Sequence, residues 1–65
     1  MAGDYALLAK LRDLDEAMEE AEHWLEKYRT EAVPELRMAH MRRYVEDRER
    51  AISLMWVVAD HGREK

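Results

Sequence analysis

Apolar residues recur through the first half of the chain with the three- and four-residue spacing of an amphipathic helix. The main row runs through Leu7, Leu11, Leu14, Met18, Ala21, Leu25 and Tyr28, and Ala17 and Trp24 widen it on one flank. The acidic residues of this half lie mainly outside the row. The pattern predicts a helix over about residues 4–29.

The second half repeats this spacing in a different register. Its row runs through Met38, Met41, Val45, Arg48, Ile52, Met55 and Ala59, and it predicts a second helix over about residues 34–61. If the first row is continued past the middle of the chain, it falls mostly on polar residues such as Glu35, Arg42 and Glu46. The sequence therefore predicts two separate helices.

The segment between the two rows contains the pair Val33-Pro34. Proline lacks a backbone donor and steers the residue before it towards extended backbone, so we expect a turn at about residues 30–33. The second helix begins with Pro34 at its first position or, alternatively, with Thr30 as its N-cap. The expected fold is an all-α antiparallel hairpin, a single domain over residues 1–65, in which paired residues have numbers that sum to about 64.

Both ends of the chain are apolar around most of the helix circumference, at residues 5–9 and at eight of the nine residues 51–59. A hairpin brings these segments to one end, yet two helices cannot cover surfaces that point away from each other. We therefore expect a homo-oligomer, most simply a dimer in which two hairpins form a four-helix bundle. Its predicted interface residues are Tyr5, Leu7, Leu8, Leu54, Met55, Trp56 and Val58.

Composition narrows the classes of protein. Cysteine is absent, no apolar run approaches the ~20 residues that span a bilayer, and the start of the chain lacks the pattern of a signal peptide. We therefore expect a cytoplasmic protein without a membrane partner. The net charge of −4 disfavours nucleic acid binding. Residues 4–29 carry eight acids and four bases, so the acidic first helix complements the arginine-richer second one.

The segment Glu20-Ala21-Glu22-His23 contains a Glu-x-x-His pair. This pair resembles the metal-binding motif of ferritin-like di-iron carboxylate bundles, and the hairpin pairing brings His40 near His23. The resemblance implies that Glu20, His23 and His40 hold iron, manganese or zinc. The alternative is a solvated helix face without a cofactor, because Glu20 and His23 lie outside the apolar row.

Arg48 is the polar member of the second apolar row. A buried arginine needs a partner, and antiparallel pairing places Asp15, Glu16 and Glu19 near it. A polar residue in a helix contact can also determine register and oligomeric state.

The sequence contains no serine–histidine–acid set, phosphate loop or zinc-finger spacing. We therefore predict a non-enzymatic helical interaction or regulatory module that self-associates and binds another protein. The alternatives are a metal-binding bundle and a structural subunit of a larger assembly.

Overall fold

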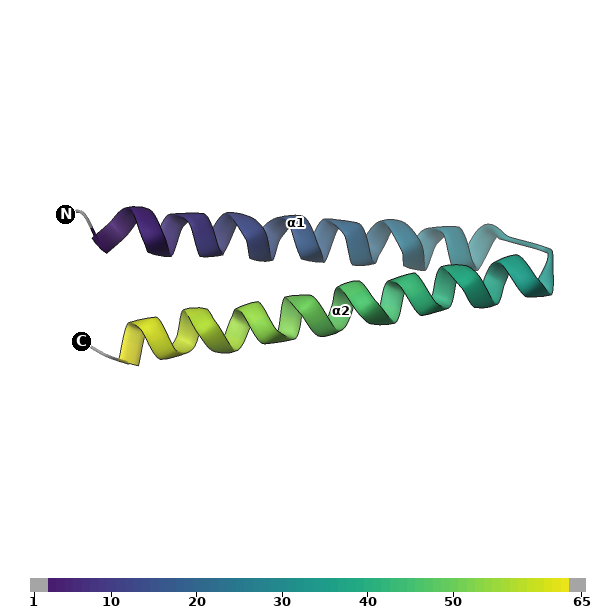
Figure 1. Ribbon diagram of the computed structural model, residues 1–65. Coiled ribbons are helices and arrows are strands. Elements are labelled where there is room, and N and C mark those ends of the chain that lie inside the picture. Colours follow the sequence, from purple (N-terminus) through teal and green to yellow (C-terminus); the bar gives the residue numbers. More distant parts are fainter. Residues whose placement is uncertain (1–2, 64–65) are drawn as a thin grey trace.

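A computed structural model describes the backbone of residues 3–63 and the side chains of residues 5–61. Two helices make up this part of the chain, α1 (Gly3–Thr30) and α2 (Pro34–Arg63), and they lie side by side in opposite directions (Figure 1). The predicted all-α hairpin is confirmed. Both helices are slightly longer than the apolar rows indicated, since polar end residues extend the backbone hydrogen bonding without adding to an apolar stripe.

The turn is held by the carboxylate of Glu31. One oxygen of this carboxylate accepts hydrogen bonds from the backbone N–H groups of Ala32 and Val33, both at 3.1 Å. Pro34 then opens α2, where its missing N–H costs nothing, and the first helical bond runs from the Arg37 N–H to the Val33 carbonyl at 2.9 Å. The alternative with Thr30 as N-cap is wrong, because the Thr30 hydroxyl instead donates back to the Glu26 carbonyl of α1 at 3.1 Å.

The same hydrogen bonds act on the ionisation of Glu31. The Val33 N–H is the largest influence and lowers the pKa of Glu31 below its ordinary value of 4.5, and partial burial opposes this effect. The Ala32 N–H and the nearby His40 lower the pKa further. His40 Nε2 lies 3.6 Å from the second oxygen of the carboxylate, which links the turn to α2.

Aromatic and cationic side chains join the helices near the turn. Arg37 places its guanidinium 4.4 Å from the centre of the Tyr28 ring and donates from Nε to the Tyr28 carbonyl at 3.2 Å. One turn further on, the rings of Trp24 and His40 stack with their centres 5.6 Å apart. The numbers of these pairs sum to 65 and 64, so they follow the pairing that the sequence predicts.

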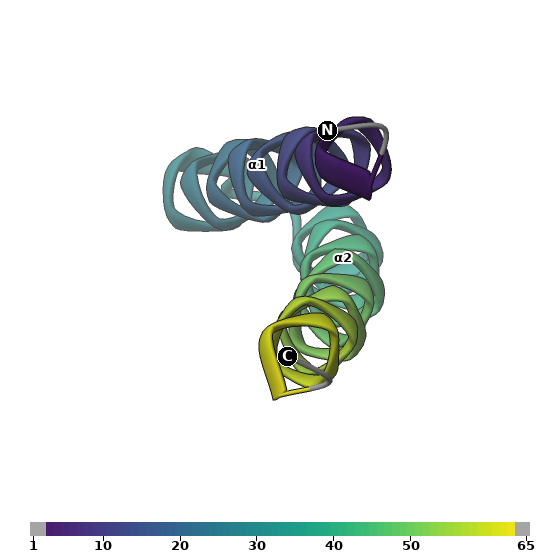
Figure 2. The ribbon, with the colours of Figure 1, turned by 90° about the vertical axis from the view of Figure 1, so that its left-hand side faces the viewer.

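Small residues form the middle of the contact between the helices. Ala17, Ala21 and Ala51 are the buried hydrophobic residues of the described part of the chain, and no large side chain there is fully buried. The absence of bulk at these positions lets the two backbones approach closely. Towards the termini the helices diverge (Figures 1 and 2). The hairpin therefore contains a thin line of contacts rather than a core.

The register of this contact corrects the sequence analysis. We call the line of buried and partly buried residues between the helices the seam. The residues of α2 in the seam include Tyr44, Asp47, Ala51, Leu54 and Val58, whereas most of the predicted row is exposed, Arg48 included. The expectation that Arg48 lies between the two helices of one hairpin is wrong, because its neighbour Asp47 occupies that position.

In α1, by contrast, most of the predicted row does lie in the seam. Ala21 is buried, Leu7, Leu14, Leu25 and Tyr28 are partly buried, and the flanking Ala17 and Trp24 join them, whereas Leu11 and Met18 are exposed. The physical reason is that apolar spacing identifies which residues avoid water but not which neighbour covers them. Here alanines occupy the most buried positions of the seam, whereas larger side chains such as Met18 of α1 and Ile52 of α2 are left at the surface.

Candidate functional site

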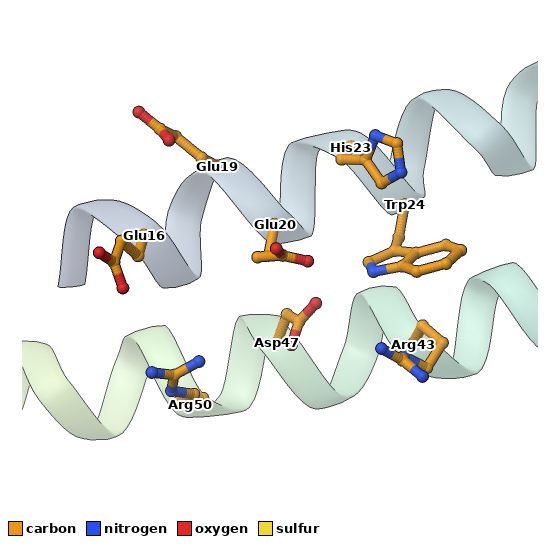
Figure 3. Close-up of a pocket in the computed structure, with 8 residues that line it drawn as sticks. All are labelled: Glu16, Glu19, Glu20, His23, Trp24, Arg43, Asp47 and Arg50. Carbon is orange, nitrogen blue, oxygen red and sulfur yellow. The ribbon is translucent and has the colours of Figure 1, made fainter. Parts of the chain in front are cut away.

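A charged cleft opens on one side of the hairpin. It has a volume of about 680 Å³, and its lining is drawn from both helices (Figure 3). Glu20 of α1 and Asp47 of α2 project towards each other across it, while Glu19 points away from α2 (Figure 3). The lining residues are Glu16, Glu19, Glu20, His23, Trp24, Arg43, Asp47 and Arg50. We call this side of the hairpin the charged face.

Trp24 forms the inner wall of the cleft. Its indole stacks on His40 and packs against His23 in a T-shaped arrangement, with the two ring centres 5.1 Å apart. The guanidinium carbon of Arg43 lies 4.9 Å from the centre of the Trp24 ring. A cation over an indole face is attracted by the ring quadrupole, so Arg43 stabilises the position of the tryptophan. The indole nitrogen and one oxygen of Asp47 are buried without a hydrogen-bond partner among the described residues.

The candidate metal ligands do not converge. His23 and His40 both contact the Trp24 ring, one in a T-shaped and the other in a stacked arrangement. Glu20 and His23 line the charged cleft, whereas His40 faces Glu31 at the turn. Within residues 5–61 no group of three or more histidine, aspartate or glutamate side chains is arranged to hold a metal ion. The geometry of one hairpin therefore gives the metal-binding alternative no support.

The position of the charged cleft also indicates which residues of α1 lie on the opposite side of the hairpin. Residues seven apart project in nearly the same direction from a helix. Glu20 lines the cleft, and it belongs to the row of residues that borders the seam on the side of Trp24. The row that borders the seam on its other side contains Leu11, Met18 and Leu25. These three apolar side chains therefore lie on the side of α1 opposite the cleft.

The same reasoning applies to α2. Arg43 and Arg50 line the cleft and belong to the row that borders the seam on one side. On the other side of the seam, the nearest row of α2 contains Met41, Arg48 and Met55. The next row outward contains Met38, Val45, Ile52 and Ala59. Since one cleft holds the charged rows of both helices, the apolar rows of both helices share the opposite side.

This arrangement produces a continuous apolar surface. Leu11, Met18, Val45, Ile52 and Met55 are all exposed large hydrophobic residues. Towards the termini the surface is hollowed into a groove of about 350 Å³, lined by Ile52, Met55, Trp56 and Ala59. We call this surface the apolar face. Its exposed members are Leu11, Met18, Val45, Ile52 and Met55, and the partly buried Leu25 and Met41 join it to the seam. Sequence analysis found these residues but assigned them to the contact within one hairpin.

The predicted interface residues divide into two groups. Tyr5, Leu8, Met55 and Trp56 are exposed, as an interface with another chain requires. Leu7, Leu54 and Val58 are partly buried in the seam, where they can contribute to such an interface only at its edge. The dimer that these residues were expected to form stays a prediction.

Arg48 lies within the apolar face of α2. Its side chain is exposed, and it makes no ion pair with a residue of the described part of the chain. It is the charged residue in the two rows of α2 that carry Met41, Val45, Ile52 and Met55. If another chain covered this surface, the guanidinium would lose contact with water and would need a partner in that chain.

Over residues 3–63, neither helix combines the length and the apolar character needed to cross a membrane. In comparisons with known proteins, the chain matches no protein-family model, no curated protein and no solved structure.

Proposed function

We propose that this protein is a non-enzymatic helical interaction module that dimerises through its apolar face into a four-helix bundle. The observation that carries the proposal is the concentration of exposed large apolar side chains, such as Leu11, Met18, Val45, Ile52 and Met55, on the side of the hairpin opposite the charged cleft. A two-layer bundle needs two such layers, and a second copy of the hairpin supplies the missing one.

The exposed area supports an interface of ordinary size. The chain exposes 5292 Å², whereas a compact folded monomer of 7.8 kDa exposes about 4,400 Å². The difference of about 900 Å² is close to the ~800 Å² that each partner loses in a standard protein interface. A second hairpin on the apolar face would therefore bring the exposed area per chain to that of a globular protein.

The charged face supplies the second half of the proposal. In a bundle built through the apolar faces, the two charged clefts point outward on opposite sides. Each combines carboxylates with Arg43, Arg50 and the Trp24 ring, a mixture that suits a polar protein surface. We therefore expect the dimer to bind another protein through these faces, without a cofactor.

The experiment compares two matched substitutions on α2. Ile52 and Val57 are both β-branched and are 37% and 40% exposed, but Ile52 lies on the apolar face and Val57 in the row of Arg43 and Arg50. We expect Ile52→Glu to convert the dimer to single chains, because it would bury two carboxylates in the interface. We expect Val57→Glu to leave the dimer intact. Native mass spectrometry reports the chain count directly.

A dimer that survives Ile52→Glu at the wild-type dissociation constant would contradict the proposed interface. A wild-type protein that remains a single chain at millimolar concentration would contradict dimerisation itself. Circular dichroism accompanies both measurements, because loss of helix in Ile52→Glu but not in Val57→Glu would show that the hairpin folds only as part of the dimer.

A further inference from the structure

Two face-to-face arrangements of the hairpins bury the same apolar faces. In one, the two-fold axis runs along the helices, the turns meet at the same end, and α2 of each chain lies on α1 of the other. In the second, the axis runs across the helices, the turns lie at opposite ends, and each helix lies on its own copy. Three features of the hairpin distinguish these two arrangements.

The first feature is the position of Arg48. It lies at the midpoint of α2, which spans Pro34–Arg63. If the turns were at opposite ends, the two copies of Arg48 would meet at the two-fold axis inside an apolar interface, and like charges there repel strongly. If the turns meet at the same end, each Arg48 faces α1 of the other copy.

The second feature is the acidic border of α1. Asp15 and Glu22 belong to the row beside Leu11, Met18 and Leu25, and both are exposed. Because paired residues sum to about 64, Arg48 stands at the level of residue 16, one residue from Asp15. With the turns at the same end, Arg48 therefore lies beside the Asp15 carboxylate of the other copy. This pairing gives the Arg48 guanidinium a carboxylate partner in the interface.

The third feature is the charge of whole helices. Residues 4–29 carry eight acids and four bases, whereas residues 31–65 carry seven of each. Opposite ends would place two acidic α1 helices against each other. The same end places each acidic helix against a neutral one, and it also brings the exposed apolar residues near the termini, such as Leu8, Met55 and Trp56, onto one another.

From these features we infer that the hairpins stack with both turns at one end of the bundle, and that Arg48 determines this orientation by pairing with Asp15 of the other copy. The inference rests on the proposed dimer and adds its geometry. Arg48 thus acts as a specificity-determining residue, since it disfavours the competing arrangement as well as stabilising the correct one.

The absence of cysteine makes the test direct. Ala32 is exposed in the turn, so Ala32→Cys carries one spin label per chain at the end of the molecule. With the turns together, double electron–electron resonance should give one distance of about 15–30 Å, since neighbouring helix axes lie ~10 Å apart. A single distance near the 50 Å length of the hairpin would overturn the orientation and leave the dimer standing. Chains without dipolar coupling and with monomer mass would overturn both proposals.

Substitutions in the labelled protein then test the role of Arg48. Arg48→Met removes the charge but keeps the bulk, and we expect a second population near 50 Å to appear beside the short distance. Arg50→Met, a control on the charged face, should leave one short distance. Arg48→Glu should weaken dimerisation roughly 10- to 30-fold, and Asp15→Arg in the same chain should restore both the affinity and the short distance. A single short distance in Arg48→Met would overturn the role of Arg48.

Discussion

Glu31 connects the sequence of the turn to the pairing of the helices. Its carboxylate accepts the N–H groups of Ala32 and Val33, which precede α2 and have no partner within a helix. It also lies beside His40, a residue of the seam. A carboxylate at this place interacts favourably with the partial positive charge at the N-terminus of α2, as an N-cap side chain does. One side chain thus ends the turn and helps to orient the two helices.

We expect the contribution of Glu31 to stability to depend on pH. Because the pKa of Glu31 is lower in the folded chain than its ordinary value of 4.5, its ionised form stabilises the fold. The contribution is fully present above about pH 4.5, and it is lost as the pH falls through the folded-state pKa. Glu31→Ala should therefore lower the midpoint of thermal unfolding at pH 7, and the difference from wild type should shrink at pH 3.

Glu49→Ala is the matched control, since it removes an exposed carboxylate from the middle of α2. It should change the midpoint little at pH 7. Equal losses at pH 7 and pH 3 for Glu31→Ala would show that the hydrogen bonds of its ionised form are not the cause.

At the scale of the helices, the fold depends on where the small residues lie. Ala17 and Ala21 of α1 and Ala51 of α2 are the buried hydrophobic residues of the described part of the chain, and all three lie in the seam. The apolar rows with bulkier residues, such as Met18 and Ile52, border this contact without entering it. Each helix consequently has two adjacent apolar surfaces, one used within the hairpin and one left for another layer.

Ala51→Leu tests this division. A leucine has no room at a position that is 6% exposed, so it should force the helices apart and lower the free energy of unfolding by about 1–3 kcal/mol. Ala39→Leu places the same group on an exposed site of the same helix and should change stability by less than ~0.5 kcal/mol. Urea unfolding at one fixed chain concentration measures both. Equal effects would mean that the seam is not closely packed at Ala51.

The whole molecule is long and thin. Its extents are 50 × 15 × 11 Å and its radius of gyration is 15.1 Å, whereas a compact domain of this length has a radius of about 11 Å. A shape of this kind exposes apolar area that a second layer would cover. In the proposed dimer, one added hairpin supplies this layer, and we expect the charged faces to disfavour further stacking.

If folding and dimerisation are coupled, the unfolding temperature must rise with chain concentration, because only the folded state associates. For a dimer of 130 residues, we expect a rise of about 5 °C for each tenfold increase in concentration. Calorimetry over a hundredfold range measures this dependence. A midpoint that stays constant over this range would indicate that the single hairpin carries the full stability by itself.

Much of the fold follows from the sequence alone. Val33-Pro34 predicts the turn, and the change of apolar register predicts two helices. The pairing sum brings His40 to the level of His23, and the residue that His40 stacks on is the neighbouring Trp24. The apolar character of residues 5–9 and 51–59 also predicts that one end of the hairpin exposes hydrophobic side chains. These features are local, or they follow from chain length and the antiparallel direction, so they need no knowledge of packing.

Tertiary structure alone decided which row of α2 enters the contact. This helix packs through Asp47 and Ala51, and this choice turns Arg48 and Ile52 outward. Periodicity could not reveal it, because the two registers of α2 differ by only one residue, a rotation of about 100°, and both contain apolar residues at the same spacing. The closeness of approach that small side chains permit selects one row over its neighbour, and that selection creates the apolar face.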